Sequence, residues 1–219
     1  MPTVSELYQG SISTDTIVNN DPNLRPEKSW TSELSGERDL ERGSLRATLF
    51  HETTEDALYS QTNVTVTPTV TSIQNVDEIR TTGIELAFQS ARFLGERLDL
   101  STSVTYAHSR IVENANFPAS VDKWQPRVPE WRANAVAAYQ IASQWTVTVG
   151  GRYSGKQYNT LDNSDPNGYT FTGNSAFLVF DTRARYESEK WTASLGIDNV
   201  GDYEYWAFHP YSQRTFVAE

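Results

Sequence analysis

Histidines and one acidic segment are the residues whose types could bind a metal. His51, His108 and His209 are the only histidines, and their spacing matches no metal-ligand motif. The segment LDNSDPNGY offers oxygen ligands, but Pro166 breaks the alternating register that an EF-hand loop needs. Surface histidines and a Pro/Asn/Gly turn are therefore the better interpretations, and we expect no metal site and no cofactor.

Catalytic motifs are also missing from the sequence. It contains no Ser-His-Asp arrangement, no glycine-rich phosphate loop and no HExxH motif. The chain has no Cys, which excludes a thiolate nucleophile, a disulfide framework and a thiolate metal site. Its net charge of −10 and its lack of a Lys/Arg-rich run argue against nucleic-acid binding. We therefore expect neither an enzyme nor a nucleic-acid-binding protein.

Aromatic residues are better candidates for ligand contact. The chain has 6 Trp, 11 Tyr and 9 Phe although only 37% of its residues are hydrophobic, so aromatics serve more than a core. Displayed in loops, they could stack on a catecholate, a corrin or a sugar. Six fall in two loops that we predict below: Tyr158, Tyr169, Phe171, Trp206, Phe208 and Tyr211. The alternative, that they anchor a rim at a membrane–water interface, stays open.

Three arginines are candidates for contact with an anionic substrate, because they fall on the polar faces of predicted strands. These are Arg152, Arg183 and Arg185. Such residues can instead pair with acidic neighbours across a lumen. The sequence offers three such neighbours: Asp181, Glu85 and Asp99.

The segments that position these residues alternate with a period of two. In WTVTVGGRYSG, apolar residues from Trp145 to Tyr153 alternate with polar ones from Thr146 to Ser154, which is typical of a strand. Similar alternation predicts strands in further segments: 45–49, 84–89, 98–106, 131–141, 180–186 and 191–198, with 30–38 fitting less well and a last strand beginning near 214. We therefore predict an all-β chain with about eight full strands and a truncated ninth.

The connections between these strands alternate in length. Short ones are expected near 39–43, 93–96, 142–144 and 188–190. Long ones cover about 1–28, 53–78, 109–129, 155–176 and 200–213. This alternation is typical of antiparallel outer-membrane barrels, which have short periplasmic turns and longer external loops. A soluble β-sandwich would give the same strand pattern and is the alternative.

Aromatic spacing favours the barrel. Trp145 and Tyr153 are eight residues apart, and so are Trp131 and Tyr139. At ~3.3 Å per residue and a tilt of ~40°, each pair spans ~20 Å of membrane, close to the ~25 Å apolar band between aromatic girdles. We therefore expect one face to contact lipid, with Trp131, Ala135, Trp145, Val147, Val149, Leu195 and Ile197. The lumen face would carry Thr148, Arg152, Arg183 and Arg185.

Four stretches resemble the carboxy-terminal part of TonB-dependent outer-membrane receptors. They are PTVSELYQG, NNDPNLRPEKSWTSELSGER, NVDEIRTTGIELAFQ and IDNVGDYEYWAFHPYSQRTFVAE, and they occur in the family's order. In that family the NPNLRPE-type segment leads from a long external loop into a strand. The resemblance further implies that Gly83-Ile84-Glu85 opens a strand and that the segment from Asp198 to Val200 ends the penultimate one.

The resemblance implies a fold, a function and partners. The fold is a transmembrane barrel of about 22 strands filled by an amino-terminal plug. Residues 1–219 would be the carboxy-terminal portion of this barrel, without the plug. They would form an open curved sheet and would be a fragment at both ends. The function is energy-coupled uptake of a bulky scarce nutrient, most often a ferric siderophore, with cobalamin, other metal chelates or oligosaccharides as alternatives. The partners are that ligand, outer-membrane lipid and, through the plug, the TonB protein. The location is the outer membrane of a Gram-negative bacterium, and no catalytic residues are implied.

Overall fold

A single sheet contains all the strands of the computed structural model. The structure describes residues 3, 7, 8, 10–19, 21–63, 66–93, 95–165, 168–170, 173–207 and 214–218. In these ranges no helix is long and apolar enough to cross a membrane. The strands are β1 (Ser11–Ile12), β2 (Thr16–Asn19), β3 (Lys28–Leu40), β4 (Gly43–Asn63), β5 (Thr69–Ser90), β6 (Leu98–Glu113), β7 (Trp131–Ala142), β8 (Trp145–Ser154), β9 (Phe177–Glu187), β10 (Thr192–Asp198) and β11 (Thr215–Ala218).

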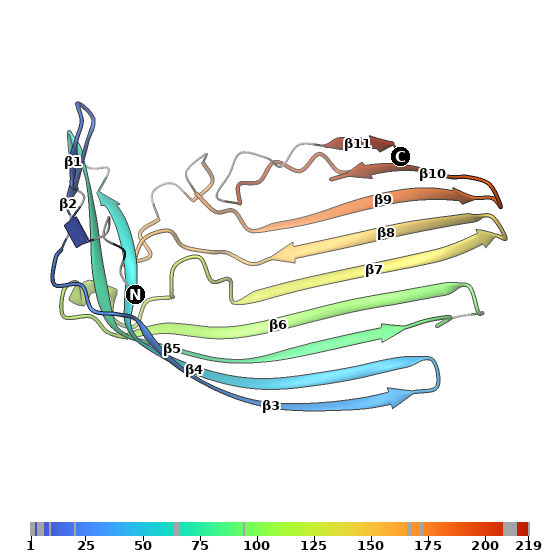
Figure 1. Cartoon of the computed structure of the whole chain (residues 1–219), viewed down its shortest axis with the longest axis horizontal. Coiled ribbons are helices and arrows are strands. Elements are labelled where there is room, and N and C mark those ends of the chain that lie inside the picture. The colour runs from blue at the N-terminus through green and yellow to red at the C-terminus, as the bar shows by residue number, and fades with distance from the viewer. Residues whose placement is uncertain are drawn as a thin grey trace.

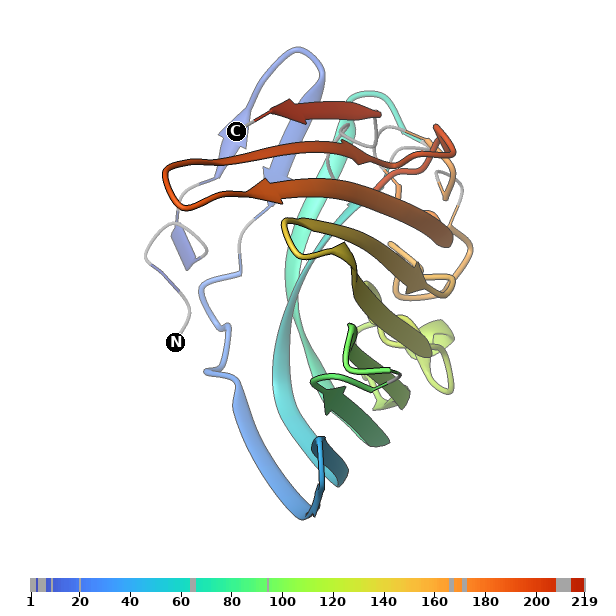
Figure 2. The ribbon, with the colours of Figure 1, turned by 90° about the vertical axis from the view of Figure 1, so that its right-hand side faces the viewer.

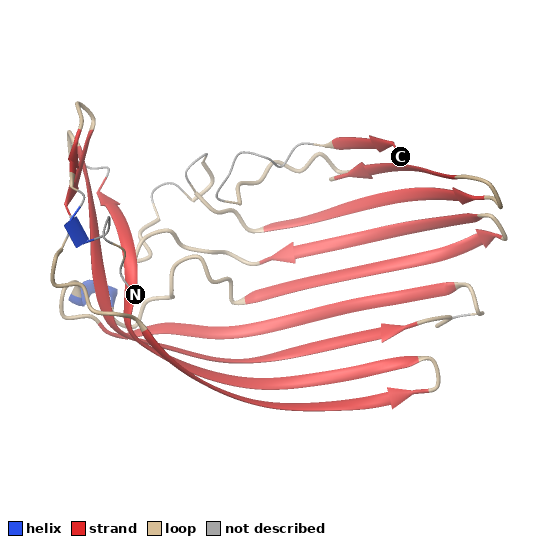
Figure 3. Ribbon diagram, viewed as in Figure 1, coloured by secondary structure: helices blue, strands red, loops and turns tan. Residues whose placement is uncertain are grey.

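Strands β3 to β11 pair antiparallel with their neighbours in chain order, as the sequence predicts. The four short turns gather at one end of the sheet, and the long connections lie at the other (Figures 1 and 3). Seen from the short-turn end, the strands follow an arc that is open on one side (Figure 2). Because the described strands make one curved sheet, the β-sandwich alternative is not observed.

One face of this sheet is apolar from β3 to β11. Residues directly opposite each other in antiparallel strands share a face. Leu34 pairs with Leu49, which pairs in turn with Ile84, and the same face continues to Leu195 and Phe216 near the other edge. Most of its large side chains are exposed, including Leu195 at 69%. All seven residues expected to face lipid lie on it: Trp131, Ala135, Trp145, Val147, Val149, Leu195 and Ile197.

The other face is polar and concave. Thr148 pairs with Arg183, and Arg152 bonds Asp181, which lies on the same face. The cavities between the sheet and the long connections open on this side. The predicted separation of Val149 from Arg152 is therefore confirmed.

Aromatic side chains mark both ends of the apolar face. At the short-turn end, the Tyr186 ring lies 5.0 Å from Trp145 and 4.9 Å from Trp191, centroid to centroid. At the opposite end, the rings of Tyr106 and Trp131 are 4.8 Å apart. Their positions match the two girdles predicted from the aromatic spacing.

The expected long loop over 53–78 is wrong, because most of it is strand. β4 and β5 keep pairing as far as Asn63 and Val70, and their distal parts turn across the long-loop end of the sheet (Figure 1). Ala57 and Val76 are buried there in a small core whose other buried members are Ile79, Ile111 and Leu161. Apolar and polar residues do not alternate regularly over these extensions, and Asp56 with its positive φ interrupts β4, which is why periodicity missed them.

The expected loop over 1–28 also contains structure. β1 and β2 form a short antiparallel pair, and β2 joins the distal part of β5 in parallel, with Thr16 opposite Thr69. This parallel pair is an exception to the predicted pairing of sequence neighbours. Two-residue and four-residue strands are too short for a period to be read from the sequence.

Gly83 lies inside β5, not at a strand start as the family pattern suggested. A Cβ atom at this position would lie 2.3 Å from Cζ of Phe50 and 2.3 Å from the carbonyl oxygen of Tyr106. The Phe50 ring therefore occupies the space over the glycine. By contrast, β10 ends at Asp198, as the family pattern predicted.

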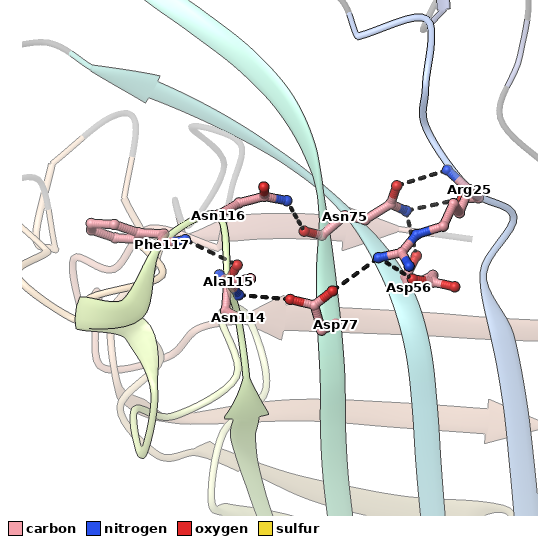
Figure 4. Close-up of polar contacts among 8 residues, drawn as sticks. All are labelled: Arg25, Asp56, Asn75, Asp77, Asn114, Ala115, Asn116 and Phe117. Atoms are coloured by element: carbon pink, nitrogen blue, oxygen red, sulfur yellow. Dashed lines mark hydrogen bonds and ion pairs between the residues drawn. The ribbon is translucent and has the colours of Figure 1, made fainter.

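Polar contacts fix the bend in β4 and β5 (Figure 4). The Arg25 guanidinium lies 2.8 Å from Oδ1 of Asp56 and 2.9 Å from Oδ1 of Asp77. Asp56 has a positive φ of 56°, so the backbone is irregular at the bend. The second oxygen of Asp77 accepts the N–H of Ala115 at 2.6 Å. Asp77 thereby joins the segment before β3 to the loop after β6.

Asn75 completes this cluster as a buried side chain with all its polar atoms satisfied. Its Oδ1 accepts the Arg25 N–H at 2.7 Å, and its Nδ2 donates to the carbonyls of Arg25 and Asp56. The backbone carbonyl of Asn75 accepts a hydrogen bond from Nδ2 of Asn116 at 3.0 Å. These bonds replace the regular ladder where the strands bend.

Candidate ligand-facing recess

Arg152 and Asp181 form a two-point ion pair on the concave face. Nε and Nη2 of Arg152 lie 3.0 and 3.2 Å from the two carboxylate oxygens. Oδ1 of Asp181 also accepts the N–H of Asn199 at 2.8 Å, which ties the end of β10 to β9. The pairing that the sequence offered as an alternative role for Arg152 is therefore present.

Arg183 and Arg185 follow along the same face of β9. Nη2 of Arg185 lies 3.1 Å from Oε2 of Glu187, and both side chains are more than half exposed. Arg183 lies between Thr148 of β8 and Gly196 of β10. The three predicted arginines thus line one face, as expected, but only Arg152 reaches the cavity described next.

Three arginines line a recess between the concave wall and the long connections. Arg132 and Arg152 come from adjacent strands, and Arg127 comes from the loop after β6. The cavity has a volume of about 370 Å³. Amide side chains supply further hydrogen-bonding groups: Asn134, Gln157 and Asn174.

A second recess of about 360 Å³ adjoins the first. Arg127 and Arg132 line both cavities, so these two side chains stand between them. Phe50, Glu52 and Gln125 are on the far side of the second cavity. The pair of cavities runs along the concave wall beside the long-loop end.

Arg132 is the least compensated of these cations. Among the described residues it has no ion-pair partner, whereas Arg152 is held by Asp181. It lies between Thr105 of β6 and Ser154 of β8, neither of which carries charge. A guanidinium with five N–H donors and no carboxylate can bind an anionic group through two parallel hydrogen bonds.

Two of the predicted aromatic candidates are chain neighbours of residues that line the recess. The carbonyl of Tyr158 accepts the Arg127 N–H at 2.8 Å, and Nζ of Lys156 lies 4.5 Å from the Tyr158 ring centre. Trp206 donates its N–H to Oγ of Ser175 at 3.0 Å. Their chain neighbours Gln157 and Ala207 line the cavity. The structure therefore brings these two loops together.

The remaining aromatic candidates are not placed in the recess. Tyr169 is 62% exposed. Phe171, Phe208 and Tyr211 lie outside the described residues. Sequence reasoning missed Phe177 and Tyr205, whose rings are 4.3 Å apart on the concave side.

Within the described ranges, no cluster of three or more metal-ligand side chains is present. His51 and His108 are exposed, as expected, and His209 lies outside those ranges. The LDNSDPNGY segment begins as a turn, in which Asp162 accepts the backbone N–H and Oγ of Ser164. Burial alone would raise the pKa of Asp162, but these hydrogen bonds outweigh burial and lower it.

Sequence reasoning did not single out Arg132, and it missed Arg127. Arg132 alternates with the apolar residues of β7, so the period of two predicts that it lies on the polar face of this strand. Arg127 lies in a loop, and a contact between loops decides its position: its N–H reaches the Tyr158 carbonyl. No periodic signal in the sequence could have found it.

Comparison with known proteins identifies the family. Residues 1–200 match the family model described as TonB dependent receptor-like, beta-barrel. The chain belongs to this family. TonB-dependent receptors are transport receptors of the Gram-negative outer membrane and not enzymes, and the curved sheet with an apolar convex face is part of such a barrel.

One relative is the probable TonB-dependent siderophore receptor PiuA of Acinetobacter baumannii. The two sequences are 26% identical over 203 residues, which cover 88% of this chain and 25% of that protein. The chain therefore spans about a quarter of the length of this curated relative.

Solved structures of receptors and transporters share the fold. The siderophore receptor PiuA from Acinetobacter baumannii matches with a TM-score of 0.66 and 22% identity, over 88% of this chain and 27% of that chain. The copper transporter OprC matches with 0.70 and 17%, over 99% and 34%. The ferric-catecholate import receptor Fiu from K12 E. coli matches with 0.67 and 20%, over 97% and 29%.

Proposed function

We propose that residues 1–219 form the carboxy-terminal part of the barrel wall of an outer-membrane receptor that takes up a ferric siderophore. The observation that carries this proposal is the separation of the two faces. An apolar face with aromatic residues at both ends suits lipid, and the opposite face presents arginines and amides to a lumen. Membership of the TonB-dependent receptor family supplies the transport context.

The ligand is anionic in this proposal. Many iron chelators bind the metal through negatively charged oxygens, and such groups suit guanidinium donors. Arg127, Arg132 and Arg152 line the recess, and Tyr158 and Trp206 are next in the chain to Gln157 and Ala207, which also line it. The relative PiuA is described as a probable siderophore receptor, which supports the same ligand class.

Energy coupling would come from parts of the receptor other than residues 1–219. A plug inside the barrel would face the polar wall and contact the TonB protein. The concave face then has two roles in the complete receptor, as a partner surface for the plug and as one side of the ligand path.

Iron uptake tests this function. The receptor that contains these residues would be expressed in a Gram-negative strain lacking its own siderophore receptors, and uptake of radioactive iron would be measured with ferric siderophores of several classes. We expect uptake of at least one class, and its loss when the strain lacks TonB. Arg132→Gln should weaken siderophore binding about tenfold, because it removes charge-assisted hydrogen bonds.

Arg46→Gln is the matched control. Arg46 also lies on the concave face, in β4, but lines neither recess. The variant should bind the siderophore as the unmodified receptor does. Uptake that persists without TonB, or a receptor found in the soluble fraction, would contradict the proposal.

A further inference from the structure

The convex face continues beyond its aromatic residues on the long-loop side, where it becomes polar. β4, β5 and β6 continue beyond the level of Tyr106, and their convex-face residues form three further rows across the strands. The first row runs from His51 through Thr82 to His108. Nδ1 of His51 and Oγ1 of Thr82 are 2.8 Å apart, so this row is polar and hydrogen-bonded.

The second row contains two arginines directly opposite each other. Arg80 of β5 pairs in register with Arg110 of β6, and Thr53 precedes them on β4. Like charges opposite each other in an antiparallel pair are destabilising. The ion pair with Glu78 offsets the charge of Arg80, whereas Arg110 has no ion-pair partner among the described residues.

Trp124 extends the second row on the other side of Arg110. The two residues form an isolated antiparallel bridge, which puts Trp124 on the same convex face. The Arg110 guanidinium lies 3.7 Å from the Trp124 ring centre, and the His108 ring packs edge-on against the same indole at 5.1 Å. Nη1 of Arg110 donates to the Asp122 carbonyl at 2.8 Å, and within the described part of the chain its other donors have no hydrogen-bond acceptor.

Acidic residues appear only in the next row. There Glu55 pairs in register with Glu78, which pairs with Glu113. Arg80 turns toward this row, with Nη2 2.5 Å from Oε1 of Glu78. Moving outward from the apolar band, the order is therefore aromatic, then histidine and threonine, then arginine and tryptophan, and only then carboxylate.

We propose that Arg80, Arg110 and His108, with Trp124, bind the phosphate of an anionic lipid headgroup in the outer leaflet. Arg110 is four residues beyond Tyr106, ~13 Å along the strand and ~10 Å along the membrane normal at a tilt of ~40°. Lipid phosphates lie just outside the hydrocarbon, where tryptophan is also enriched. The patch continues the lipid-facing surface, so this inference rests on the proposed function.

Native mass spectrometry of the complete receptor in mild detergent tests the patch. Phosphatidylglycerol and zwitterionic phosphatidylcholine would be titrated separately, with inorganic phosphate as competitor in a third arm. We expect tighter binding of phosphatidylglycerol and no displacement by inorganic phosphate. Arg80→Gln and Arg110→Gln should each weaken phosphatidylglycerol binding about fivefold.

Controls separate the possible outcomes. Arg46→Gln removes the same charge from the concave face and should not change lipid binding. Arg80→Gln leaves the Trp124 contacts intact, so its effect cannot come from loss of that packing. Unchanged phosphatidylglycerol binding in both arginine variants, equal losses with phosphatidylcholine, or displacement by inorganic phosphate would overturn the inference. Cell fractionation tests the proposed function and not the lipid site. A receptor that is absent from the outer membrane would contradict the proposed function.

Discussion

Ile79 and Ile111 lie directly opposite each other across β5 and β6, and both are almost fully buried, at 2% and 0% exposure. They belong to the part of the sheet beyond the aromatic residue Tyr106, where the bent strands and the loops pack together. Leu161 from the loop after β8 covers them and is also fully buried. Large side chains of the apolar face are mostly exposed, so this small cluster is what packs the long-loop end of the sheet together.

The first prediction concerns this core. Ile111→Ala should destabilise the folded receptor by about 2–4 kcal/mol, because it leaves a cavity among packed side chains. Leu195→Ala is the control, since Leu195 lies on the convex face at 69% exposure, and it should cost less. Urea unfolding in detergent measures both. Equal costs would show that the external cluster is not a core.

A second prediction concerns Tyr59, which packs beside this core. Burial raises the pKa of Tyr59, and the hydrogen bond from Gln125 only partly offsets this effect. A raised pKa in the folded state means that folding favours the neutral phenol. Its contribution to stability is therefore complete below the ordinary tyrosine pKa of about 10 and is lost as pH rises through the folded value.

The unmodified receptor should thus lose stability more steeply above about pH 10 than Tyr59→Phe, which cannot ionise there. Urea unfolding at neutral and at alkaline pH measures the difference. Spectrophotometric titration should also show one tyrosine fewer in the late-titrating group of the variant. Identical alkaline profiles for the two proteins would refute the assignment.

Gly83 gives a third prediction. Gly83→Ala should destabilise the receptor by about 1–3 kcal/mol, because the new methyl group meets the Phe50 ring and the Tyr106 carbonyl. The control is Gly36→Ala in β3, where no atom lies within 4 Å of the added Cβ. That change should be neutral or slightly stabilising. Thermal unfolding of the two variants side by side would decide the matter, and a harmless Gly83→Ala would contradict the packing.

Charge on the two faces gives the fourth prediction. Val149→Arg places a cation on the lipid-facing side and should cost about 2–4 kcal/mol near the membrane midplane. Ser103→Arg is the control, because Ser103 lies on the concave face between Ala87 and Asn134 and has no arginine opposite it. It should cost less than about 1 kcal/mol. Folding into vesicles, followed by urea titration, compares the two.

The sheet itself could be predicted from the sequence because one of its faces is apolar and the other is polar. Val149 and Arg152 fall on opposite sides in the structure as the period of two requires. The same reasoning failed for Ala57 and Val76, which lie in strands where the expected loop was placed. There Ala57, Leu58 and Tyr59 are consecutive apolar residues, and Val70, Ile73 and Val76 are three residues apart, so the sequence has no period of two.

The recess could be predicted only in part, for a related reason. Arg152 was found because it alternates with apolar neighbours. Arg127 and Asn174 come from different loops, and hydrogen bonds between distant segments bring those loops together: Nδ2 of Asn163 donates to the Trp124 carbonyl at 2.9 Å. Contacts of this kind depend on tertiary packing and leave no local pattern.

The most direct test of the membrane wall uses the absence of cysteine from this chain. Single cysteines would be placed at successive positions from 146 to 152 of β8 in the receptor and labelled in intact outer membranes with a water-soluble maleimide. Our account predicts labelling at Thr146, Thr148 and Arg152, and protection at Val147 and Val149, where a lipid-soluble reagent should react instead. Equal labelling of Thr148 and Val149 by the water-soluble reagent would contradict it.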